Sequence, residues 1–152
     1  MKQGIFSLPC AALLALFSLT GASALAQEAP DLQACIDRTA YREDVPVQAF
    51  HACYDESTGY WDKQLNDRYQ KARAGCAAAT KPDECRQKLR HAERLWMQYR
   101  DAMSAAFDQV SSGAGMGAMP ARGTVYRATR HQAEELDFFI RQAESFKEAG
   151  QP

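Results

Sequence analysis

Apolar and aromatic residues recur every three or four positions over three long stretches of the chain, the spacing that places them on one face of an α-helix. These stretches cover residues 47–76, about 83–110 and about 124–147. In the second stretch, the apolar stripe expected to face the core continues from Tyr99 to Val110. No stretch of useful length alternates apolar and polar residues as a β-strand does. The pattern therefore predicts an all-α fold, a small helical bundle of three main helices.

A short N-terminal helix is expected ahead of these three. Asp31 has a side chain suited to capping a helix N-terminus, and the helical spacing that follows it ends near Thr39. Within the first long stretch, Gly59 is expected to separate a shorter helix from a longer one, because glycine is a poor helix former. Four glycines and a proline lie in residues 111–123, so this segment is expected to be a loop of thirteen residues.

The N-terminal residues have the pattern of a cleavable export signal. Lys2 is their one charged side chain, an apolar run covers residues 5–19, and a small-x-small sequence follows at residues 24–26. The apolar run is too short to cross a bilayer comfortably. We therefore expect a signal peptide over residues 1–26 and a single helical domain over residues 27–152, exported to the periplasm and not inserted in a membrane.

Four cysteines follow the expected signal peptide, and an even number in a small exported domain predicts two disulfides. They are Cys35, Cys53, Cys76 and Cys85. Of the three possible pairings we favour the one that joins the first two and the last two, because each bond then clips the loop between neighbouring helices. Each bond would stabilise the fold by about 2–4 kcal/mol. The alternative, a structural metal site, needs closer cysteine spacings with histidines nearby.

Polar and aromatic side chains share the helical stripes of the first two long stretches. They are Asp62, Asn66, Tyr69, Trp96, Tyr99 and Arg100. Polar groups left half-satisfied between helices are costly, so we expect a structural network in which Asp62 pairs with Arg100 across two antiparallel helices. Asn66 and the Tyr69 hydroxyl would complete its hydrogen bonds. The alternative is that these residues form a ligand or partner site.

The expected glycine-rich loop carries three side chains that could contact a partner. Met116 and Met119 would adapt to another protein's surface, and Arg122 could bind a carboxylate through two hydrogen bonds. An unstructured connector is the alternative interpretation of this segment. Because thioethers bind copper(I), a copper-binding protein of the cell envelope using the two methionines is a second functional hypothesis. A third is an interaction module for another envelope protein.

Charge and motifs exclude several functional classes. The formal net charge is −1 over the whole chain, and no basic cluster is present, which argues against nucleic acid as a partner. No arrangement typical of a catalytic triad or a phosphate-binding loop is found. We therefore expect a binding protein that is not an enzyme, uses no cofactor and exists as a monomer or weak dimer.

Two motifs resemble a known family. The pattern D-x-x-L-N-x-x-Y stands at residues 62–69, and L, W, Y-R-D follow at residues 89–101. Together they resemble the small exported domain named for the LprI-type lysozyme inhibitors, and Cys35 and Cys53 are similar to the cysteine pair of that family. The sequence departs from the family at Ser104, where a cysteine is common. The resemblance implies a helical fold and a protein partner, a lysozyme, whose activity the protein would block.

Overall fold

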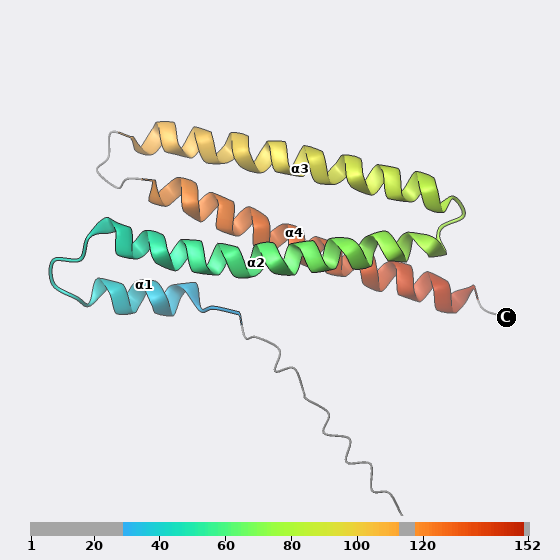
Figure 1. The fold of residues 1–152 in the computed structure, drawn as a ribbon, viewed down its shortest axis with the longest axis horizontal. Helices are drawn as coiled ribbons and strands as arrows, with labels where there is room; N and C mark the ends of the chain where they lie inside the picture. The colour runs from blue at the N-terminus through green and yellow to red at the C-terminus, as the bar shows by residue number, and fades with distance from the viewer. Residues whose placement is uncertain (1–28, 113–117, 151–152) are drawn as a thin grey trace, which may run out of the picture.

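The computed structural model describes residues 29–112 and 118–150, and every regular element within these ranges is helical. The all-α prediction, with three long helices after a short one, is confirmed (Figure 1). The expected signal peptide and Met116 lie outside the described residues. The elements are α1 (Leu32–Ala40), α2 (Val47–Gly75), the 3₁₀ turn η1 (Cys76–Ala78), α3 (Pro82–Ser111) and α4 (Met119–Ala149).

The first two helices begin where the sequence predicts. The side chain of Asp31 caps α1 by accepting a hydrogen bond of 2.9 Å from the backbone N–H of Ala34. The prediction that Gly59 divides the next helix is wrong, because α2 is continuous from Val47 to Gly75. Gly59 lies on the exposed face with open space around it. Its helix penalty of about 1 kcal/mol is outweighed by the packing of the residues on either side.

The last helix begins earlier than predicted, because residues 119–123, expected to belong to a loop, form the first turn of α4. Pro120 stands in that turn, where a missing backbone N–H costs no hydrogen bond. Gly123 is buried, and a Cβ at this position would lie 3.5 Å from a ring carbon of Tyr54 on α2. The glycine therefore allows a close approach of two helices.

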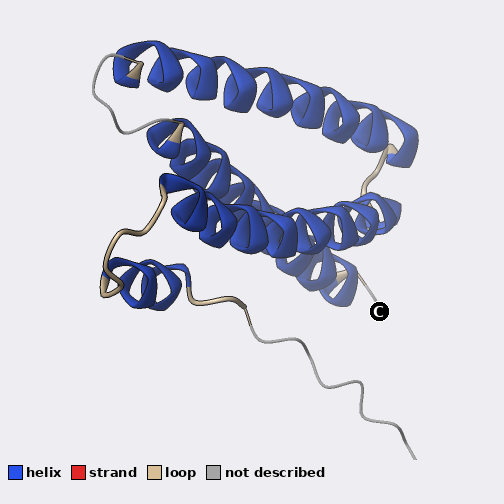
Figure 2. Ribbon diagram, turned by 60° about the vertical axis from the view of Figure 1, so that its left-hand side comes forward, coloured by secondary structure: helices blue, strands red, loops and turns tan. Residues whose placement is uncertain are grey.

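Helix α4 makes the main contacts of the bundle. It runs parallel to α2 and antiparallel to α3, and it packs against both (Figures 1 and 2). The fully buried core cluster consists of Leu65 and Ala72 of α2 with Ala133 and Leu136 of α4. Larger side chains that are partly buried surround it: Trp61, Tyr69, Leu89, Trp96, Phe139 and Ile140. The core is thus formed mainly between α2 and α4.

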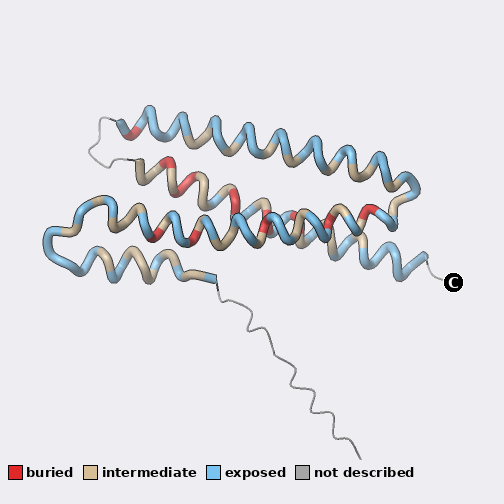
Figure 3. Tube along the Cα trace, viewed as in Figure 1, coloured by how far each residue is buried: buried red, intermediate tan, exposed pale blue. Residues whose placement is uncertain are grey.

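Helix α3 lies at the edge of this arrangement and packs against α4 and η1. Ser111 is its one buried residue, whereas α2 and α4 each bury several (Figure 3). The predicted core stripe on α3 is wrong in its second half, since Tyr99 is 60%, Phe107 37% and Val110 83% exposed. The reason is that α2 covers a different face of α4 and does not cover this part of α3.

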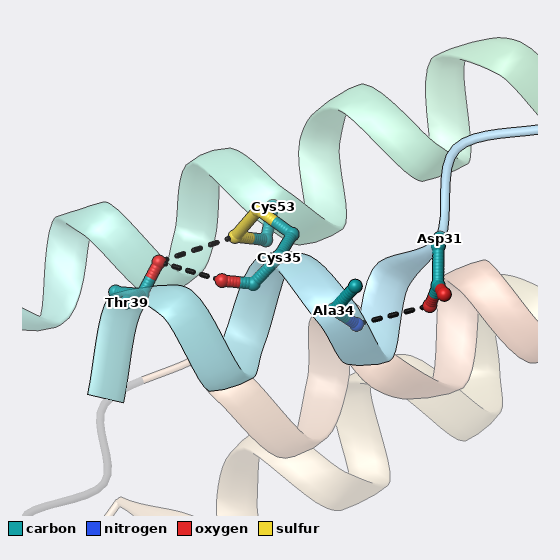
Figure 4. The surroundings of a disulfide bond; sticks show 5 residues. All are labelled: Asp31, Ala34, Cys35, Thr39 and Cys53. Atoms are coloured by element: carbon teal, nitrogen blue, oxygen red, sulfur yellow. Dashed lines mark hydrogen bonds between the residues drawn. A yellow bond between two sulfur atoms is a disulfide. The ribbon is translucent and has the colours of Figure 1, made fainter. Parts of the chain in front are cut away.

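Both disulfides have the favoured pairing. Cys35 of α1 is bonded to Cys53 of α2, and Cys76 of η1 is bonded to Cys85 of α3, with Cα separations of 5.8 and 5.7 Å. At the first bond, the hydroxyl of Thr39 donates to the carbonyl oxygen of Cys35 at 2.8 Å and lies 3.6 Å from the sulfur of Cys53 (Figure 4). Because α1 has no buried residue, this bond is its main attachment.

Candidate functional site

Two grooves flank the contact between α3 and the N-terminal half of α4. Residues of both helices line each groove, and α2 adds a wall to one of them. The acidic groove is lined by Asp55, Thr58, Asp101, Ser104, Ala105, Asp108, Ala118, Ala121, Arg122 and Val125. The aromatic groove is lined by Trp96, Tyr99, Met103, Phe107, Thr124, Arg127, Ala128 and His131. These hollows are the candidate binding surfaces.

The acidic groove has a volume of about 490 Å³ and brings together carboxylates from two helices. Asp55 of α2 is ion-paired with Arg122 of α4, and Asp101 is ion-paired with Arg100 at 2.8 Å. Within the described ranges, Asp108 makes no ion pair. Because Asp55 and Asp101 are each paired with an arginine, the negative charge of the groove comes from Asp108.

Of the three predicted partner contacts, the structure describes two. Met119 is the first residue of α4, and Arg122 lies one turn later in the same helix. Arg122 does not project from a loop as expected. Its guanidinium pairs with Asp55, and its Nε atom is buried without a hydrogen-bond partner among the described residues. To bind a partner's carboxylate, Arg122 would have to give up its ion pair with Asp55.

The aromatic groove has a volume of about 370 Å³ and lies on the other flank of the α3–α4 contact. Arg127 lies on the α4 side of this groove, and its guanidinium donates a hydrogen bond of 3.2 Å to the hydroxyl of Thr124. The ring of His131 stands 3.7 Å from the carboxylate of Glu135. Four apolar or aromatic side chains of α3 face these polar groups across the groove.

The expected ion pair between Asp62 and Arg100 does not form. Arg100 donates to Asp101 on its own helix at 2.8 Å, and its guanidinium lies 5.0 Å from the centre of the Trp96 ring. Asn66 donates to the backbone oxygen and the carboxylate of Asp62 at 2.9 and 3.3 Å, also within one helix. The cause is the same as for the exposed stripe: α3 packs along α4, so α2 and α3 are not close partners.

Polar contacts between helices exist at other positions, which the sequence analysis missed. Arg68 of α2 donates to Asp137 of α4 at 2.7 Å, and Gln132 of α4 donates to Glu93 of α3 at 3.1 Å. Burial raises the pKa of Glu93 above its usual range, against the opposing effect of the Gln132 hydrogen bond. Glu93 lies three residues before Trp96, on the border of the apolar stripe. That position could have indicated a polar contact with a neighbouring helix.

The described residues offer no site for a metal ion built from three or more His, Cys, Asp or Glu side chains. In the same ranges, no helix is long and apolar enough to cross a membrane. The copper hypothesis depends on Met116, outside the described residues, and on Met119. Among the hollows of the described surface, the acidic and aromatic grooves differ in chemistry and are suited to binding another molecule.

The family model described as lysozyme inhibitor LprI matches residues 35–136, about two thirds of the chain. The matched region begins at the cysteine that anchors α1 and ends at the core residue Leu136, so it includes both grooves. Neither the curated proteins nor the solved structures gave a significant match. The match over most of the helical region shows that the chain belongs to the LprI lysozyme inhibitor family.

Proposed function

We propose that this protein is an exported inhibitor of lysozyme that acts by binding the enzyme. The observation that carries the proposal is the family match over residues 35–136. The pattern of residues 1–26 supports export, because it has the charge, the apolar run and the small residues of a cleavable signal. The proposed inhibitor works by occupying a surface of the enzyme and needs no chemistry of its own.

The charge of the acidic groove supports a basic partner. Lysozymes of the animal type are basic proteins, and a negative surface attracts such a partner over distances of about 10 Å at ordinary salt. Asp101 and Asp108 line this groove on α3, and Asp108 makes no ion pair with the described residues. Their carboxylates would mainly increase the rate of association, because exposed charges change encounter rates more than they change the final affinity.

The test is lysis of peptidoglycan-walled cells by an animal-type lysozyme, with and without the processed, disulfide-bonded protein. We expect inhibition that rises with protein concentration and saturates at one inhibitor for each enzyme molecule. Unchanged lysis at micromolar protein, with no binding to lysozyme by calorimetry, would contradict the proposal.

A charge-reversed pair of variants measures the contribution of the acidic groove. Asp101→Lys/Asp108→Lys should slow association with lysozyme at low salt by about tenfold. Glu148→Lys, an exposed position at the far end of α4, is the control and should change the rate little. Equal association rates for the groove variant and the parent would exclude the acidic groove as the attracting surface.

A further inference from the structure

The aromatic groove contains apolar surface that the fold leaves uncovered. Tyr99 and Phe107 of α3 are 60% and 37% exposed, and Met103 lies between them on the same face. These positions follow the helical spacing of a core stripe, yet the described helices leave Tyr99 mostly exposed and cover Met103 and Phe107 only in part. An amphipathic stripe that remains exposed beside a groove is typical of a protein–protein contact surface.

The types of residue in the groove fit such a contact. Tryptophan, tyrosine, methionine and arginine are enriched in the centres of protein interfaces. Trp96 is held in place by the core and by the guanidinium of Arg100, 5.0 Å from its ring centre. Tyr99 adds a large ring with few rotatable bonds, so ordering it on binding costs little entropy. Trp96 and Tyr99 therefore give the groove two rigid anchors beside the more flexible Met103 and Arg127.

The charges of the groove indicate the kind of partner it fits. Arg127 is exposed, and its one hydrogen bond among the described residues is to the Thr124 hydroxyl, so no carboxylate of that part of the chain neutralises it. The other nearby cation, Arg100, is paired with Asp101. A partner that supplies a carboxylate to Arg127, surrounded by surface that accepts aromatic rings, would satisfy both features.

The substrate cleft of a lysozyme has this chemistry. Glycoside hydrolases of this kind carry two carboxylates on either side of the bond that they cleave, and the cleft is a groove shaped to hold a ring-built chain. Resting on the proposed function, we propose that the aromatic groove docks on this cleft, with Tyr99 and Phe107 against its walls and Arg127 facing its carboxylates.

The test compares inhibition by two groove variants and two matched controls. Tyr99→Ser/Phe107→Ser removes the rings, and Arg127→Glu reverses the charge. Tyr41→Ser replaces an exposed tyrosine at the C-terminal end of α1, and Arg141→Glu reverses an exposed arginine in the C-terminal half of α4. We expect about tenfold or greater loss of inhibition in each groove variant, and a change of less than about twofold in the controls. Circular dichroism and thermal unfolding of all four variants report whether the fold is kept.

A competition experiment tests the cleft itself. A soluble N-acetylglucosamine oligomer that fills the cleft should displace the parent protein from lysozyme. If the parent inhibits but the groove variants inhibit equally well, or the oligomer does not compete, the docking proposal is overturned while the proposed function stands. If the parent neither inhibits nor binds lysozyme, the proposed function fails and the docking proposal fails with it.

Discussion

Helices α2 and α3 have nearly the same length, 29 and 30 residues, and both pack on α4, but they do so very differently. Helix α2 buries four residues and α4 buries six, whereas α3 buries only Ser111. The contact between α2 and α4 therefore determines the stability of the fold. Helix α3 keeps most of its surface exposed, and that surface forms one side of both grooves.

Small residues explain why α2 and α4 come close together. Ala72 and Ala133 are fully buried in the core cluster, and Gly123 faces the ring of Tyr54. Close packing of this kind maximises dispersion contacts between helices. Helix α3 packs Leu89 and Trp96 around this core and is also held by the Cys76–Cys85 bond and the Glu93–Gln132 hydrogen bond. The two contacts should respond differently to mutation.

The largest difference is expected for a matched pair of leucine substitutions. Leu65→Ala, at a position of α2 that is 3% exposed, should lower the free energy of unfolding by about 2–5 kcal/mol because it leaves a cavity in the core. Leu95→Ala, on the 51% exposed face of α3, should change it by less than about 0.5 kcal/mol. Urea unfolding of both variants measures this. Similar losses in the two variants would mean that α3 contributes to the core as α2 does.

The next effect concerns the bond that holds the start of α3. Replacing Cys76 and Cys85 with alanine opens a loop between positions nine residues apart and should lower stability by about 2–3 kcal/mol. The pair Cys35→Ala/Cys53→Ala is the comparison. It should release α1 while the core stays folded, because α1 buries no residue. Amide hydrogen exchange distinguishes the two: fast exchange confined to residues 32–40 is expected only in the second variant.

A pair of glycine substitutions compares an exposed position of α2 with a buried position of the α2–α4 contact. Gly59→Ala, where a Cβ meets nothing within 4 Å, should stabilise the protein by about 0.5–1 kcal/mol through helix propensity. Gly123→Ala should gain less or lose stability, because its Cβ would lie 3.3 Å from the Arg127 guanidinium and 3.5 Å from the Tyr54 ring. Thermal unfolding compares them, and an equal gain at both positions would contradict the close approach at Gly123.

The smallest effect is expected at Glu93, on the α3 side. Burial raises its pKa in the folded protein above the ordinary value of 4.5, so the folded state holds the proton more tightly than the unfolded chain. Stability should therefore fall as pH rises from about 4.5 through the raised value. Glu93→Gln should remove this dependence and raise stability at pH 7 by less than about 1 kcal/mol, since the group is partly solvated. The measurement is the free energy of unfolding of the parent and the variant at several pH values. The same pH dependence in both proteins would contradict a role for the burial of Glu93.

Local chemistry made the helices predictable. The cap at Asp31 and the proline at residue 82 define helix starts through their own backbone preferences, so α1 and α3 have almost the predicted bounds. Gly59 and Pro120 misled the prediction, because whether such a residue breaks a helix depends on its position and on packing. Helical periodicity was reliable where tertiary contacts agreed with it.

The candidate site was less predictable than the fold. Periodicity shows which face of a helix is apolar, but not which neighbour covers it, so the exposure of Tyr99 was not foreseen. For the same reason the sequence could not show that Arg100 bonds to Asp101 and not to Asp62. The aromatic groove depends on both facts. Choice of helix neighbours is a property of the whole bundle and has no local signal.

The disulfide pairing bears on how the protein could mature. The four cysteines beyond residue 26 are bonded in consecutive pairs along the chain, first Cys35 with Cys53 and then Cys76 with Cys85. With export as proposed above, the chain would emerge from a translocation channel with its N-terminus first and present these thiols in the same order. An oxidase that joins each newly emerged pair would thus produce the native connectivity directly, without an isomerase to exchange wrong bonds.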